Sequence, residues 1–457
     1  MLRLITLVLS VFAFAPAALC IVSYDNDFVD PNYILSKSFN TSTAASQESI
    51  VQWADSLAAE GPWSVMNKSV NPPSGNKHDY LSWAPYWWPN CTGVGNTTEL
   101  TPQQIWVTCP YYVRDGMFNP DGRLVDDVGN FSDMADAVLY NAMAWVLTGE
   151  SKYSANTAYF VDTWFLNPAT SMNPNLNFAQ MQRGPGPSGQ TGTHTGVLDL
   201  KGMVKVTTGI LILRTANSPD WTSDFETQMN NWTTQYITWL QTSPIALEEA
   251  AATNNHGSYY FNQLSAVQIL AGDTNGAKNT TATYFAGIYM NQIDASGEQP
   301  LEAVRTRPYH YRCYNLAAMI TNARLGEFLG LDSLWNKTTT KGGTIKAALD
   351  FTMTVQPGDE LASELYPNIA AVAANYGDPN DKYAAFLANA DNTYPAQPYF
   401  LWDQPFTDSN LAAATPTANS QPTTTSNSHN GEFVSSHPSL MAASFMTLFL
   451  TCVLLVI

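Results

Sequence analysis

One short segment of this sequence concentrates basic and phenolic side chains. The chain has only nine Arg among its 457 residues, yet the segment EAVRTRPYHYRCYNL holds three of them, interleaved with three Tyr: Arg305, Arg307, Arg312, Tyr309, Tyr311 and Tyr314. A local basic cluster in an acidic protein indicates an anion site. Nearby positive charge also stabilises a phenolate, so we expect a lowered pKa for a Tyr here. The alternative is a structural turn held by ion pairs, since Glu302 and other carboxylates are available.

A second segment, NNHGSYY (residues 254–260), places two amides and an imidazole just before an apolar helical stretch. Polar groups at a helix N-terminus lie at the positive end of the helix dipole, which favours a bound carboxylate. His256 could serve as a base near neutral pH. The alternative interpretation is helix capping by Asn next to an ordinary histidine.

Aromatic residues dominate a third segment, KHDYLSWAPYWWPN (residues 77–90), in which five of fourteen residues are Trp or Tyr. A flat aromatic wall suits a sugar-binding site, because sugar rings present C–H groups to aromatic faces. The alternative is a hydrophobic plug that packs this region onto the rest of the protein. A fourth segment, CPYYVRDGMFNPDGR (residues 109–123), predicts by itself only a structured loop.

Together these residue types suit β-elimination from a uronic acid. The C5 proton is weakly acidic, so hydrogen-bond donors or cations must neutralise the attached carboxylate while a base removes the proton and an acid protonates the departing O4. Asn, His and Arg supply the first function, and Tyr or His supply the others. In mannuronate and glucuronate the C5 hydrogen and O4 lie on the same face, so one Tyr can act as base and then as acid.

The composition bounds the class of protein. Hydrophobic residues make up 45% of the chain and aromatic residues 12%, which is enough for a large core. Lys and Arg total 20 against 38 Asp and Glu, for a net charge of −18, so we expect no nucleic-acid partner. This charge also repels a polyanionic sugar, so the Arg cluster must attract it locally. The repulsion argues against alginate itself and leaves a glucuronic-acid-containing wall polymer as a candidate.

Both ends of the chain resemble processing segments. Residues 1–20 combine an Arg, an apolar run and small residues, which predicts a secretory signal peptide; a buried helix is the alternative. Residues 409–438 form a Ser/Thr/Pro-rich linker, and residues 439–457 form an uncharged apolar tail typical of a GPI signal; a plain tail anchor is the alternative. We therefore expect a secreted, extracellular protein that is GPI-anchored at the cell membrane or wall and touches the membrane only through that anchor.

Sequons and cysteines agree with export. Eight Asn-x-Ser/Thr sequons predict a glycoprotein, at Asn40, Asn67, Asn90, Asn96, Asn130, Asn231, Asn279 and Asn336. An oxidising compartment favours a disulfide between Cys91 and Cys109, across a loop that contains Pro and two Gly. Cys313 is then expected to be a buried free thiol.

The middle of the chain predicts an all-α fold, because its apolar periodicity is helical and strand alternation is scarce. Helices are expected at residues 133–150, 154–166, 198–215, 224–241, 259–270, 282–294, 311–329, 345–355 and 360–376. Successive antiparallel helix pairs indicate a toroid or a helical array. We expect one domain over residues 21–408, in which residues 21–125 form a loop-rich arm against the mouth of the helical body.

Six segments, in their order along the chain, resemble those of the alginate-lyase-like polysaccharide lyases, a family that includes alginate and glucuronan lyases. They are KHDYLSWAPYWWPN, YYVRDGMFNPDG, NFAQMQRGPG, NNHGSYY, RTRPYHYRCYNL and NIAAVAANYGDP, and the likeness spans residues 77–390. It implies an (α/α) toroid, an incomplete helical barrel, with the active cleft across one face. The dense sequons and the GPI-like tail depart from bacterial members and indicate a fungal one.

The resemblance implies that Asn255, His256, Arg305 and Tyr311 are catalytic, with Asn255 neutralising the sugar carboxylate. His256 is either the base for anti elimination from guluronate or a second group that holds the carboxylate, and Arg307 is the alternative to Arg305. Substrate-binding residues are expected to be His78, Tyr80, Tyr86, Trp87, Gln180, Asn254 and Arg307. The Gly-rich loop GPGPSGQTGTHTG is longer than the family's, so His194 receives no role.

Two other classes of protein stay open. A helical-toroid glycoside hydrolase would need two carboxylates beside the scissile bond, with Asp126, Asp127, Asp133 and Glu302 as candidates. A non-catalytic, wall-anchored protein could bind a polysaccharide through the aromatic wall alone. No metal-ligand spacing appears in the sequence, so we expect no metal and no cofactor, and we expect a monomer.

Overall fold

The computed structural model describes residues 27–95, 99–331 and 334–403, and every structural statement below concerns these residues. The expected signal peptide, linker and apolar tail lie outside them. The described chain is mainly helical, with one two-stranded sheet. None of its helices is both long enough and apolar enough to cross a bilayer.

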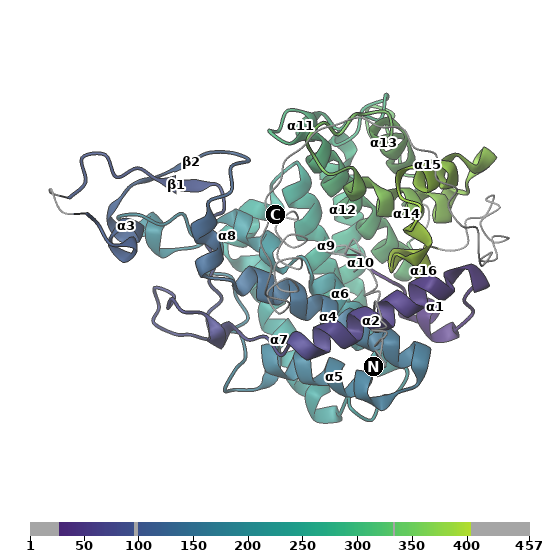
Figure 1. Ribbon diagram of the computed structural model, residues 1–457, viewed down its shortest axis with the longest axis horizontal. Coiled ribbons are helices and arrows are strands. Elements are labelled where there is room, and N and C mark those ends of the chain that lie inside the picture. The colour runs from purple at the N-terminus through teal and green to yellow at the C-terminus, as the bar shows by residue number, and fades with distance from the viewer. Residues whose placement is uncertain (1–26, 96–98, 332–333, 404–457) are drawn as a thin grey trace, which may run out of the picture.

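A ring of helices forms the body of the protein (Figure 1). Each helix of the ring contacts the next, in the order α2 (Ala44–Glu60), α4 (Asp127–Thr148), α6 (Met203–Thr215), α9 (Asn255–Leu270), α12 (Pro308–Phe328), α14 (Tyr366–Tyr376) and α16 (Tyr399–Trp402). The ring closes because α16 packs on α2. The fold is an (α/α) toroid, which confirms the predicted fold class.

A second set of helices packs against the ring helices. These are α1 (Pro31–Ser36), α5 (Ser151–Val161), α7 (Ser223–Thr242), α10 (Thr274–Ala286), α13 (Ile345–Thr352) and α15 (Lys382–Ala390). Ring helix α6 is enclosed on every side: all residues from Met203 to Leu213 are buried. In contrast, α7 buries one stripe along its length. The two short helices α8 (Pro244–Ala250) and α11 (Pro300–Ala303) lead into α9 and α12.

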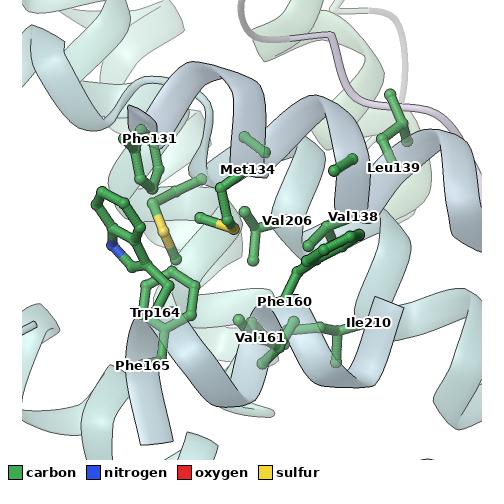
Figure 2. Close-up of a cluster of buried hydrophobic side chains, with 14 of the residues drawn as sticks. Phe131, Met134, Val138, Leu139, Phe160, Val161, Trp164, Phe165, Val206 and Ile210 are labelled. Atoms are coloured by element: carbon green, nitrogen blue, oxygen red, sulfur yellow. The ribbon is translucent and has the colours of Figure 1, made fainter. Parts of the chain in front are cut away.

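The core between α4, α5 and α6 is built from large apolar side chains (Figure 2). A π-helical turn, Asp162–Leu166, continues α5 and adds Trp164 and Phe165 to this cluster. The Trp164 ring lies 5.5 Å from the ring of Phe131 on α4. Such close packing makes the ring a rigid support for the residues at its ends.

An arm carries the sheet and projects to one side of the ring in Figure 1. It contains β1 (Trp87–Pro89), α3 (Pro102–Thr108) and β2 (Tyr111–Val113), and the two strands are antiparallel. The predicted disulfide Cys91–Cys109 is present in it, and Cys313 is a buried free thiol, as expected.

The N-terminal region is less loop-rich than the sequence suggested. Helix α2 lies within it and packs on α4, burying Ile50, Ala54 and Leu57 at helical spacing. The prediction of a loop-rich arm over residues 21–125 is therefore wrong for Pro31–Ser36 and Ala44–Glu60, which are helical. The short helices α8 and α15 were not expected either, because so few residues display little periodicity.

Candidate active site

The N-terminal turns of α9 and α12 lie side by side. The Ser258 hydroxyl donates to Asn315 Oδ1 at 2.8 Å, and the rings of Tyr259 and Tyr314 are 4.2 Å apart. Because both helices belong to the ring, the packing of the toroid brings together the two segments in which the sequence concentrates candidate groups.

The buried carboxylate of Glu302 holds Asn255. Its Oε1 accepts from the Asn255 backbone N–H at 2.8 Å, and its Oε2 accepts from Nδ2 at 2.7 Å. Burial raises the pKa of Glu302, although Asn255, Arg305 and His256 act in the opposite direction. Asn255 has no exposed surface in this conformation. Its amide nitrogen carries two hydrogens, and Glu302 takes one of them, so the other is the donor that a sugar carboxylate could use.

His256 is the second residue of α9 and is anchored through both backbone and ring. Asn254 caps the helix, with its Oδ1 accepting from the His256 backbone N–H at 3.3 Å. Nδ1 of His256 lies 2.7 Å from Oε1 of Glu249, and the side chain is 16% exposed. The other carboxylate oxygen of Glu249 lies 2.6 Å from Nδ1 of His194. His194, which had no role in the sequence analysis, is thus a neighbour of His256.

Tyr311, on α12, lies against Arg305, which precedes that helix. The guanidinium carbon of Arg305 is 3.8 Å from the centre of the Tyr311 ring, and the Tyr311 phenol is hydrogen-bonded to that of Tyr86. Burial, and then the neighbouring Tyr86, raise the pKa of Tyr311 above its usual value, and Arg305 only partly offsets them. The expectation of a lowered pKa is therefore wrong for Tyr311, because desolvation outweighs the nearby positive charge.

The three Arg residues of the cluster have separate surroundings. Arg312 forms a bidentate ion pair with Glu298, at 2.7 and 2.8 Å, so for this residue the structural alternative holds. A guanidinium nitrogen of Arg307 lies 3.7 Å from a carboxylate oxygen of Glu364. Arg305 pairs with Asp115 of the arm, at 3.6 Å, and stacks on the ring of Tyr311. This geometry favours Arg305 over Arg307 as the site Arg.

The arm reaches the site through Tyr86 and Asp115. Tyr86 meets Tyr311 through its phenol, and Oδ2 of Asp115 accepts from the Thr306 hydroxyl at 3.1 Å. Trp87 follows Tyr86 in the sequence, begins β1 and is half-buried. The aromatic segment thus contributes to the site, although many of its side chains pack inward.

Three further residues expected to bind substrate form hydrogen bonds with groups other than Asn255, His256, Arg305 and Tyr311. Tyr80 is fully buried and its hydroxyl donates to Asp199 at 3.2 Å. Gln180 donates to the same carboxylate at 2.8 Å. Nδ1 of His78 lies 2.6 Å from the backbone oxygen of Ser171. Tyr80 belongs to the plug that the alternative interpretation described.

Sequence reasoning missed the carboxylate beneath His256 and His194. Glu249 lies in α8, a seven-residue helix that begins at Pro244. Its only signal was the Glu-Glu pair shortly before NNHGSYY. The role of Glu302 was also missed, since that residue was considered for ion pairing or for hydrolysis but not as the partner of Asn255.

Among the described residues, His194, Glu249 and His256 are the group whose types and spacing could hold a metal ion, with ligand atoms within 4.8 Å of one another. Two His and one Glu also form known zinc sites. The imidazole-to-carboxylate distances of 2.6 and 2.7 Å are those of charge-assisted hydrogen bonds. We therefore describe these residues as a hydrogen-bonded group.

Comparison with known proteins identifies the family of this chain. The sequence matches the alginate lyase family over residues 64–360. The structure of an alginate lyase from Bacteroides ovatus is similar with a TM-score of 0.72 and 29% identity, covering 83% of this chain and 99% of that one. Alginate lyase A1-III from Sphingomonas species A1 gives a TM-score of 0.45 and 15% identity, over 74% and 92% of the two chains. No curated protein matches the sequence significantly. Because the family match includes the arm, most of the ring and both segments of the site, the chain belongs to the alginate lyase family and is a polysaccharide lyase.

Proposed function

We propose that this lyase cleaves a mannuronate- or glucuronate-containing polymer, of the alginate or glucuronan type, by β-elimination. The observation that carries the proposal is the stacking of Arg305 on Tyr311, at 3.8 Å, beside the carboxylate that holds Asn255. An amide donor and a phenol therefore come from the first turns of two ring helices, α9 and α12, and a cation comes from the bend just before α12. These are the groups that elimination from a uronate requires.

The first task of the site is to neutralise the sugar carboxylate. The free N–H of Asn255, the ring of His256 and the guanidinium of Arg305 would surround it, and the N-terminal dipole of α9 adds to their effect. With its charge balanced, the carboxylate can accept the electron pair that the C5–H bond releases. The C5 proton then becomes acidic enough for a protein base.

The second task is to move one proton. Tyr311, as the phenolate, takes the C5 proton; the electron pair then forms the C4–C5 double bond while the C4–O4 bond breaks. The phenol just formed returns its proton to O4, which stays on C1 of the preceding sugar and becomes the anomeric hydroxyl at the new reducing end of that fragment. Tyr311 ends as the phenolate in which it began, so one residue completes the cycle on a substrate with C5–H and O4 on one face.

A panel of polyuronates tests the proposed function. We expect the purified protein to release ultraviolet-absorbing unsaturated uronate from polymannuronate or glucuronan, and less from polyguluronate or pectate, whose reacting groups do not suit a single Tyr. The measurement is product absorbance, with mass spectrometry to separate unsaturated from hydrated products. Hydrated products would indicate a hydrolase, and binding of a polymer without any product would indicate a non-catalytic protein.

The pH dependence tests the role of Tyr311. Because burial raises the pKa of this phenol, the phenolate fraction of the free enzyme should still be growing at pH values where an ordinary Tyr begins to ionise, about 10. We expect kcat/KM to rise with pH from neutrality into the alkaline range without a plateau. A plateau that begins near the ordinary pKa of an imidazole, about 6.5, would instead assign the base role to a histidine.

Of the four carboxylates considered for a hydrolase, three make structural contacts; for the fourth, Asp133, burial raises the pKa to about 7. Asp127 is buried, pairs with Lys68 at 3.1 Å and accepts from the Leu81 backbone N–H at 2.9 Å. Asp126 lies 3.5 Å from Arg123, and both oxygens of Glu302 hold Asn255. These contacts favour the lyase mechanism over two-carboxylate hydrolysis.

Export to the cell surface remains part of the proposal. Of the sequon asparagines that the structure describes, five are exposed and none is buried: Asn67, Asn90, Asn231, Asn279 and Asn336 are exposed, and Asn40 and Asn130 are half-buried. Exposure is what glycosylation requires. The Cys91–Cys109 disulfide also suits an oxidising compartment.

A further inference from the structure

A carboxylate with no exposed surface lies between the two imidazoles of the site. Glu249, on α8, bonds to Nδ1 of His194 with one oxygen and to Nδ1 of His256 with the other, at 2.6 and 2.7 Å. The two imidazole rings are 5.9 Å apart. His194 begins the 3₁₀ segment His194–Leu200, which packs on both α8 and α9, so three separate elements meet at this carboxylate.

The protonation states in this group follow from the geometry. Burial raises the pKa of Glu249, but the charges and hydrogen bonds of the two histidines outweigh that effect and hold it below its usual value. An ionised carboxylate can only accept hydrogen bonds, so each Nδ1 must carry a hydrogen. In a neutral imidazole the proton is then absent from Nε2, which becomes the acceptor left for another partner.

We propose that Glu249 is a positioning residue that keeps a hydrogen on Nδ1 of both His256 and His194 and so leaves Nε2 of each ring for the substrate, and that His194 is a second substrate-binding imidazole, which in its protonated form donates from Nε2 to the uronate carboxylate. This inference rests on the proposed elimination chemistry and adds two residues to it. A buried, unpaired carboxylate is costly, and an apolar side chain at this position would pack at less cost. The hydrogen bonds from the two rings offset the cost of burying Glu249.

The charged groups around the pair differ for the two rings. Around His194, Nε2 lies 3.7 Å from the exposed Glu248, and the hydrogen bond from Glu249 raises the pKa of the ring. Around His256, the neighbouring charges are Glu249 from α8 and Glu302 from α11, beside Arg305. His194 therefore retains a proton to higher pH than an ordinary histidine and can offer a cation to the sugar carboxylate. This local positive charge would counteract the repulsion between an anionic polymer and a protein of net charge −18.

The substitution Glu249→Gln tests the proposal, with Glu48→Gln as the matched control. An amide has one acceptor and one donor end, so one of the two rings must face an N–H and move its proton to Nε2. We expect Glu249→Gln to lower kcat/KM by at least about tenfold, the low end for removing a residue that orients a functional histidine. Glu48→Gln makes the same chemical change at an exposed position of α2, where the side chain accepts from Gln52, and should keep kcat/KM close to wild type.

Nitrogen-15 NMR of labelled histidines supplies a readout that does not depend on turnover. In the wild type both rings should carry a hydrogen on Nδ1, and in Glu249→Gln one ring should lose it. Either ring found without a hydrogen on Nδ1 in the wild type overturns the proposal, even when the variant fails to fold. So does an active Glu249→Gln enzyme with wild-type kcat/KM, or activity that chelation removes and zinc restores. A wild-type protein that cleaves no polyuronate would defeat the proposed function, while the tautomers would still be measurable.

Discussion

The Tyr311→Phe variant should lose β-elimination almost completely, with kcat falling by about 10⁴-fold, because one hydroxyl serves as both base and acid. The phenyl ring can still pack against Arg305, whose guanidinium carbon lies 3.8 Å from the ring centre, so the surrounding structure should persist. Polymer binding should change little, since the variant keeps Asn255, His256 and Arg305. The measurements are initial rates by product absorbance and oligosaccharide affinity by calorimetry.

Tyr309→Phe is the matched control for that substitution. It removes one hydroxyl from the same helix two residues earlier, where the Tyr309 hydroxyl donates to the backbone oxygen of Ala362 at 3.3 Å, away from Arg305. The control should retain activity near that of the wild type. If Tyr311→Phe kept a rate within about tenfold of wild type, Tyr311 would not be the proton carrier, and Tyr86 would be the next residue to test.

The second large effect is expected at His256. Replacing it with Ala should lower kcat/KM by at least about a hundredfold, the low end for a positioned acid or base group. The variant removes the ring that we propose to lie beside the sugar carboxylate, and it also frees one oxygen of the buried Glu249. A thermal unfolding midpoint separates this loss from simple destabilisation, because an unfolded fraction lowers the amplitude without altering KM.

Comparison of substrates separates the two roles that His256 could have. A histidine that only holds the carboxylate should affect all uronates to a similar degree, and mainly through KM. A histidine that acts as the base for anti elimination should affect polyguluronate far more than polymannuronate, and through kcat. Wild-type rates of the His256→Ala variant on every substrate would show that His256 has only a structural role in helix capping and local packing.

The fold could be predicted from long, strongly periodic segments. The stretch from residue 133 to 150 predicted α4, and the prediction for residues 224–241 falls within α7. Helix α2 was missed because its apolar residues are separated by polar ones, and the Trp- and Pro-rich segment after it dominated the interpretation. Its burial depends on α4, which lies far along the chain, so the local sequence carried only part of the signal.

The site could be predicted in its residue types more than in its contacts. The Arg cluster indicated an anion site, but the ion pair of Arg312 with Glu298 and the stacking of Arg305 on Tyr311 depend on how the segment folds. The raised pKa of Tyr311 could not be predicted, because burial is a property of the packed molecule. The same holds for Glu249, whose two histidine partners come from two other elements, the 3₁₀ segment His194–Leu200 and α9.

By itself, the sequence determined the helical class, the disulfide pairing and the two segments that carry the amide, imidazole, guanidinium and phenol groups. These depend on local periodicity, on the number of cysteines and on residue types, all of which can be read along one chain. Only the tertiary structure decided which Arg lies on Tyr311, which carboxylates hold Asn255 and His256, and which aromatic residues are buried. The physical reason is that hydrogen bonds and desolvation act over a few ångströms, between groups that the closing of the helical ring brings together from distant parts of the chain.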